Sequence, residues 1–83
     1  MSTTQPQRVT RFAAVSLVGN EPFICETAFE TRESAVAHIH NVARKFEQRF
    51  GHLPTYPCMT VQVEYTEPDG LDVELSDWQE VTL

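Results

Sequence analysis

The chain has 83 residues, of which 41% are hydrophobic and 22% charged, a composition typical of one small globular domain. Twelve acidic residues against six basic ones give a net charge of −6, which disfavours direct nucleic acid binding because phosphate contacts need clustered cations. The longest apolar run, Phe12 to Gly19, is too short for a transmembrane helix, and the polar start lacks a signal-peptide pattern, so we expect a cytoplasmic protein.

The first half of the chain begins with a polar segment and continues with two candidate strands. Residues 1–7 show no periodicity, which predicts a disordered tail ahead of a single domain over residues 8–83. The pattern of residues 9–18 and 23–29 predicts two strands, although Phe12 and Val18 fall on the otherwise polar face of the first. Gly19 and Asn20 tolerate positive φ, so a tight turn should join the two strands into an antiparallel hairpin.

The clearest element is a helix over residues 32–50. Thr31 is suited to cap its start, and Gly51 is suited to end it in the left-handed conformation. Ile39 should lie at the centre of an apolar stripe that faces the core. The stripe consists of Ala35, Val36, Ile39, Val42, Ala43, Phe46 and Phe50.

A second hairpin is predicted after the helix. Residues 58–66 alternate without a break, with one dry face and one wet face. Residues 67–70 have turn chemistry, and residues 71–75 alternate again, whereas residues 76–83 fit neither the helical nor the strand period. The apolar positions of residues 58–66 are Met59, Val61, Val63 and Tyr65.

The predicted fold is therefore of the α+β class, in the order β-β-α-β-β, with an antiparallel sheet of about four strands and the helix packed on one face. We expect the helix to cover the apolar face of residues 58–66. Ile39 and Phe46 should then be buried together with Val61 and Val63. A domain of this size is marginally stable alone, which leaves the outer sheet face or a sheet edge for a partner or a second copy.

The two cysteines, Cys25 and Cys58, are expected to be reduced, buried strand residues. A disulfide is the alternative, but nothing in the sequence indicates export to an oxidising compartment. Neither cysteine has the spacing of a zinc site with the three histidines, and His38 and His40 lie on opposite flanks of the helix stripe. We therefore expect no metal.

No catalytic motif is present, so we expect a protein that is not an enzyme and has no cofactor. Cys58 with His52 could form a nucleophile and base, but Cys58 begins a strand and nothing indicates a cleft. Residues 69–74 loosely resemble a calcium loop, yet they lack its twelve-residue ligand pattern.

Charge is unevenly distributed along the chain. Residues 51–83 hold seven acidic residues and no Lys or Arg, whereas residues 1–50 hold all six cations and five acidic residues. Outward side chains along a strand repeat every ~6.6 to 7 Å, which is comparable to the phosphate spacing of a nucleic acid strand. The carboxylates could therefore bind a basic protein surface that normally binds DNA or RNA. Alternatively, they could simply keep the protein soluble. The predicted partner-binding residues are Glu64, Glu67, Asp69, Asp72, Glu74 and Asp77, with Tyr56 and Trp78 as aromatic anchors.

In size, acidity, lack of catalytic motifs and α+β layout, the chain resembles the small acidic phage-encoded inhibitors of bacterial defence, notably anti-CRISPR proteins. The resemblance implies a non-enzymatic protein in the host bacterial cytoplasm. Such a protein would act as a nucleic acid mimic on a basic surface of a CRISPR surveillance complex. The alternative is a small structural or accessory protein that forms a homodimer through its sheet. Charge segregation favours the inhibitor, because a scaffold has no need to collect seven acidic residues in its last third.

Overall fold

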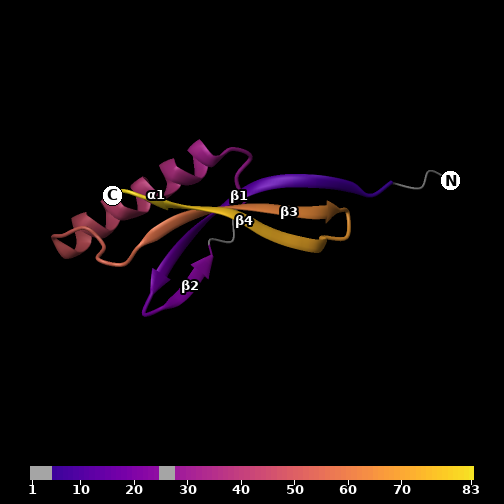
Figure 1. Cartoon of the computed structure of the whole chain (residues 1–83). Coiled ribbons are helices and arrows are strands. Elements are labelled where there is room, and N and C mark those ends of the chain that lie inside the picture. Colours follow the sequence, from indigo (N-terminus) through magenta and orange to yellow (C-terminus); the bar gives the residue numbers. More distant parts are fainter. Residues whose placement is uncertain (1–4, 25–27) are drawn as a thin grey trace.

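The computed structural model describes residues 5–24 and 28–83 and confirms the predicted α+β order (Figure 1). Four antiparallel strands form one sheet in the order β2-β1-β3-β4, with the helix packed on one face. The molecule is elongated, 57 × 22 × 16 Å, because β1, β3 and β4 extend beyond the helix (Figure 1). The elements are β1 (Gln7–Val18), β2 (Glu21–Ile24), α1 (Arg32–Phe50), β3 (Cys58–Glu67) and β4 (Leu71–Val81).

The first strand is longer than its alternation pattern indicates. β1 begins at Gln7, which pairs with Glu67 across the sheet. Residues 1–4 of the predicted tail lie outside the described residues. Gly19 and Asn20 have φ angles of 59° and 70°, which is the backbone of the tight turn that the sequence predicted.

The second strand begins two residues before the predicted start. Pro22 lies within β2 opposite Leu17, and β2 is an edge strand, where a residue without an N–H is tolerated. Residues 25–27, and with them Cys25, lie outside the described residues. Phe29 exchanges two backbone hydrogen bonds of 2.8 Å with Phe12, so the chain returns to β1 just before the helix.

The helix has the predicted boundaries and both predicted caps. The Thr31 hydroxyl accepts a hydrogen bond from the Ser34 N–H at 3.2 Å. Gly51 adopts a φ of 81°, and its N–H donates to the Glu47 carbonyl at 2.7 Å. The apolar stripe is only partly buried: Ala35, Ile39 and Ala43 are buried, whereas Val42 and Phe50 are 44% and 55% exposed.

The last strand continues to Val81, well past the predicted end of its alternation. Asp77 has a φ of 49°, and the β3–β4 register shifts between Thr60 and Gln62. The extra residue of this bulge reverses the alternation, which explains why residues 76–83 fit no single period. The turn before β4 lies where it was predicted, and Gly70 has a left-handed φ of 66°. The Gly70 N–H donates to the Thr66 carbonyl at 2.7 Å, and the Glu67–Pro68 peptide is cis.

The helix covers the face of the sheet opposite to the one that the sequence predicted. Ile39 packs against Ala14, Cys58 and Val81, with Val36, Phe29 and Tyr56 at the margin. Val61 and Val63 belong to a second cluster, with Ala13, Val15 and Leu17, that includes no residue of α1. The prediction that Ile39 and Phe46 are buried with Val61 and Val63 is therefore wrong. Alternation groups the residues of a strand by face, but it does not determine on which side a connection places the helix.

Ile39→Ala should lower the free energy of unfolding by about 2–4 kcal/mol, because it empties a buried site between α1 and the sheet. Val42→Ala on the same helix is the control, and its half-exposed side chain should cost less than about 1 kcal/mol. Denaturant melts measure both values. Equal losses for the two variants would mean that α1 does not face the sheet through Ile39.

Candidate functional site

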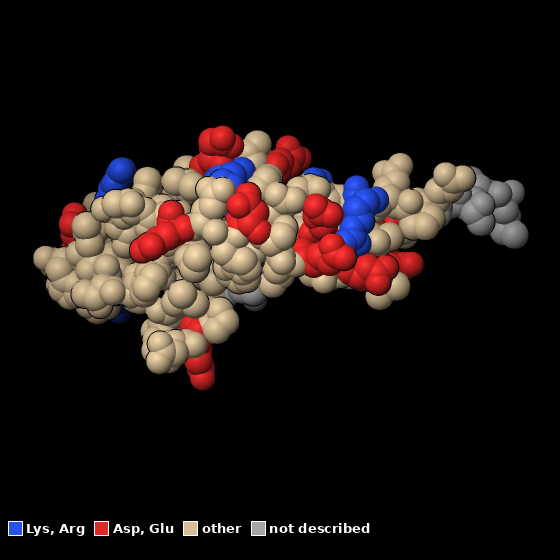
Figure 2. All heavy atoms as spheres, in the orientation of Figure 1, with Lys and Arg blue, Asp and Glu red and all other residues tan. Residues whose placement is uncertain are grey.

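The predicted acidic residues lie on the β3–β4 hairpin, whose turn is at the end of the molecule away from α1 (Figure 1). Carboxylates gather around a basic side chain on the half of the molecule that extends beyond the helix (Figure 2). We call Glu67, Asp69 and Asp72, which flank or lie in the turn of this hairpin, the acidic tip. All three are exposed, and none forms an ion pair within residues 5–24 and 28–83.

Two further predicted carboxylates are held by a cation from the other end of the sequence. Glu64 and Glu74 are directly opposite each other on β3 and β4. Arg8 on β1 reaches both, with its Nε 3.7 Å from a Glu64 oxygen and its Nη2 3.3 Å from a Glu74 oxygen. The same guanidinium donates to the Asp72 carbonyl at 2.8 Å. Arg8 thus offsets the repulsion of an opposed carboxylate pair, and Glu64 and Glu74 are only partly available to a partner.

Asp77 also has a partner within the chain. Arg32, at the first turn of α1, places its Nη2 2.8 Å from an Asp77 carboxylate oxygen and 3.2 Å from the Asp77 carbonyl. Its Nη1 donates to the hydroxyl of Thr60, a wholly buried side chain, and the guanidinium lies 4.9 Å from the centre of the Phe12 ring. Asp77 therefore helps to anchor the helix, and its carboxylate already has a counterion within the chain.

Sequence reasoning missed both arginines as partners of these acidic residues. Arg8 and Arg32 lie in the basic first half of the chain, which alone indicates no pairing. The signal lies in the register: Arg8 is opposite Thr66, so its side chain shares a face with Glu64 on the neighbouring strand. Reading that signal requires knowing that β1 pairs with β3.

The two predicted aromatic anchors are far apart in the structure. Tyr56 precedes β3, at the opposite end of this strand from the acidic tip, and it packs edge-on against Phe46 at a ring separation of 6.1 Å. Trp78 lies on β4 and is 43% exposed. Glu80, two residues on, is opposite Met59, so Trp78 is on the face of the sheet away from α1. The structure therefore does not bring Tyr56 to the acidic tip.

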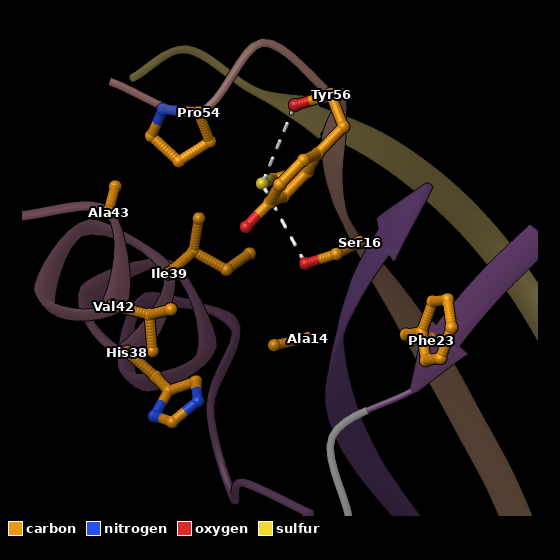
Figure 3. Close-up of a pocket in the computed structure, with 10 residues that line it drawn as sticks. Ala14, Ser16, Phe23, His38, Ile39, Val42, Ala43, Pro54 and Tyr56 are labelled. Atoms are coloured by element: carbon orange, nitrogen blue, oxygen red, sulfur yellow. Dashed lines mark hydrogen bonds between the residues drawn. The ribbon is translucent and has the colours of Figure 1, made fainter. Parts of the chain in front are cut away.

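A small recess lies between α1 and the sheet, with a volume of about 160 Å³ (Figure 3). Its lining is mainly apolar and includes Ile39, Tyr56 and the buried, free Cys58. The Cys58 sulfur lies 3.9 Å from the Ser16 hydroxyl and 4.0 Å from the Tyr56 carbonyl (Figure 3). His52 is outside this lining and interacts through its Nδ1 with the Leu53 carbonyl at 2.8 Å. The recess can hold an apolar group, but it does not pair the Cys58 thiol with His52 as a base.

Burial raises the pKa of Tyr56 above its ordinary value of 10.0, and the nearby Cys58 adds a smaller effect in the same direction. Among the described residues, no group of three or more His, Cys, Asp or Glu side chains could hold a metal ion. No helix in the described part of the chain is long and apolar enough to cross a membrane.

Comparisons with known proteins found no match to any family model, curated protein or solved structure.

Arg32→Met should lower the free energy of unfolding by about 1–3 kcal/mol, because the buried Thr60 hydroxyl loses its partner and Asp77 loses its counterion. Arg32→Lys should not restore the loss, since one ammonium group lacks the fork that reaches both groups. Arg44→Met, at an exposed position of the same helix, is the control and should stay within about 0.5 kcal/mol. A loss for Arg32→Met no larger than that of the control would contradict this role.

Tyr56 should make the protein less stable in alkali. Its raised pKa means that the folded chain holds the phenol proton more tightly than the unfolded chain, so stability falls as pH rises above 10.0 towards the folded pKa. Denaturant melts on either side of pH 10.0 measure this fall. Tyr56→Phe should show a smaller fall than the wild type, and identical pH profiles for the two proteins would refute the assignment.

Proposed function

We propose that this chain is a non-enzymatic interaction module that covers a basic, nucleic-acid-binding surface of a protein partner, namely a CRISPR surveillance complex. The observation that carries the proposal is the acidic tip: three exposed carboxylates without ion-pair partners in the described chain, at the end of a projecting hairpin. Such a feature suits a groove that normally holds DNA or RNA. Lys and Arg side chains lining that groove are the complementary chemistry.

The shape of the molecule supports this mode of binding. The long axis is 57 Å, and the other two dimensions are 22 and 16 Å. The hairpin that bears the acidic tip lies towards one end of the long axis, beside the start of β1 and clear of α1 (Figure 1). A slender end that carries negative charge can enter a channel that would exclude a wider domain.

The distribution of paired and unpaired carboxylates divides the hairpin into two parts. Glu64 and Glu74 share Arg8, so this cluster ties β1 to the hairpin and adds less net negative charge to the surface of the hairpin. The acidic tip carries its charge uncompensated, and the whole chain adds a net charge of −6. Exposed charges of this kind act mainly on the association rate, which should fall steeply as salt rises.

The test neutralises the acidic tip without disturbing the hairpin. The variant is Glu67→Gln, Asp69→Asn and Asp72→Asn. Asn suits residue 72 because Asp72 has a φ of 55°, which Asn tolerates better than most residues. Glu64 and Glu74 remain unchanged, because either replacement would remove one of the two carboxylates that hold Arg8.

The matched control is Glu21→Gln, Glu30→Gln and Glu47→Gln, three exposed carboxylates outside the hairpin. Both variants change the net charge by the same three units, so a general loss of charge affects them equally. Circular dichroism and thermal melts should first show that both variants fold as the wild type does.

The measurement is target-DNA binding by a panel of purified, crRNA-loaded surveillance complexes, with the wild type or a variant added. The wild type should block DNA binding by at least one complex, and the control variant should act similarly. The acidic-tip variant should need at least about tenfold more protein, the equivalent of one lost desolvated charge pair of about 1.4 kcal/mol or more. Equal inhibition by all three proteins would show that the tip only aids solubility, and a panel unaffected by the wild type would sink the assignment to this partner class.

A further inference from the structure

The sheet has a second apolar surface, on the side away from α1. Residues that alternate with the helix-facing positions of β1, β3 and β4 point to this side, which we call the far face. Its centre is the second cluster, in which Val15 and Val61 are 0% exposed and Ala13 is 4% exposed, so the part of the far face that is open to solvent lies at its β4 margin. Leu75 continues the far face onto β4, because it is directly opposite Val63.

The far face has the composition of a covered surface. A sheet with one face in water normally carries polar residues there. On β3 the reverse holds: Met59, Val61 and Val63 point to the far face, whereas Thr60 and Gln62 lie on the helix side. On β4, Leu75 and Trp78 remain 44% and 43% exposed on the far face. These side chains are available to pack against a partner.

The charges of the far face favour a second copy of the chain over a basic partner. Glu64, Glu74 and Asp77 are held on the helix side, by Arg8 and Arg32. Among the described strands, the register leaves Arg11 as the cation of the far face, with Glu67 and Glu80 at its two ends. Two far faces can therefore meet without opposing clusters of carboxylates.

Among the described residues, Arg11 has no carboxylate partner, which fits such a contact. Its guanidinium donates to the neighbouring Thr10 carbonyl at 2.9 Å, and within residues 5–24 and 28–83 it forms no ion pair. In a symmetric pair, Glu80 of the other copy can supply the missing carboxylate. An isologous contact provides each such pair twice.

The free edge of the sheet is a poorer site for self-association. β4 is the longer of the two edge strands, and pairing it with its own copy would bring two sets of Asp72, Glu74, Asp77 and Glu80 together. The bulge at Asp77 also interrupts its regular backbone. Charges and bulges on an edge strand discourage pairing between sheets.

The available area indicates a dimer of modest affinity. Three strands about nine residues long cover roughly 14 × 30 Å, or about 420 Å² in projection. Because Ala13, Val15 and Val61 are already buried within one chain, the area that two copies can newly bury stays below the range for stable specific interfaces, about 1,200 Å² in total. We therefore expect a pair that dissociates on dilution.

We propose that a second copy of this chain packs face to face on the far face, with Val63, Leu75 and Trp78 at the centre of the contact. The two helices lie on the outside of this dimer, and each copy keeps its acidic tip exposed. The dimer does not depend on the proposed inhibitor function. If that function holds, the dimer presents two acidic tips at once, which raises avidity towards a complex with repeated basic sites.

Sedimentation equilibrium of the pure protein tests the dimer. The average mass of the wild type should rise with concentration from 9.5 kDa towards twice that value. Leu75→Glu with Trp78→Glu should stay at the mass of one chain throughout, because it places two carboxylates at the centre of the contact. The matched control, Phe23→Glu with Val42→Glu, replaces apolar side chains that are 59% and 44% exposed on the helix side, and it should associate as the wild type does.

A second readout uses Trp78, the one tryptophan of the chain. Its fluorescence emission should shift to shorter wavelength as the wild-type concentration rises, which tests the contact even if the double variant does not fold. The acidic-tip variant should dimerise like the wild type, so failure of the dimer and failure of the inhibitor function are distinguishable.

A wild type that stays at the mass of one chain up to about 100 μM, well above the micromolar range of weak specific complexes, would overturn the proposal. Equal loss of association in both double variants, or association without a change in Trp78 emission, would also overturn it.

Discussion

Arg32 is the side chain on which the arrangement of helix and sheet depends. From the first turn of α1 it donates to Thr60 on β3, pairs with Asp77 on β4 and lies over the Phe12 ring on β1. One guanidinium thus ties the helix to three strands of the sheet. It also supplies the partner that the wholly buried Thr60 hydroxyl requires, since a buried polar group without one is costly. The helix can therefore rest on the more polar face of β3.

This placement has a direct consequence for the rest of the surface. Because the helix occupies the side of Thr60, the cleanly alternating apolar residues of β3 point away from it and form the far face with β1 and β4. The small residues Ala35 and Ala43 allow α1 to approach the sheet closely, with Ile39 as its one large buried contact. Because α1 packs on the Thr60 side of the sheet, its contacts include polar groups, and the apolar side chains of β3 lie on the side away from it.

The two surfaces that we assign to partners are physically separate. The acidic tip lies at the turn between β3 and β4, where Arg8 neutralises the neighbouring carboxylates but does not reach those of the tip. The far face spans the middle of the sheet and holds few charges. Electrostatic steering and apolar packing therefore act at different sites, so a change at one site should leave the other intact.

The local elements follow from the sequence, because caps, turns and alternation are properties of neighbouring residues. Thr31 and Gly51 determined the ends of α1, and Gly19 and Gly70 determined the two hairpin turns. Of the candidate site, the sequence determined that carboxylates gather in the second hairpin. Only the tertiary structure decided which of them are free. Pairing of Glu64 with Arg8, 56 positions earlier in the printed sequence, depends on the register between β1 and β3. The face under the helix was likewise decided by long-range packing, since strand alternation has no preference between the two sides of a sheet.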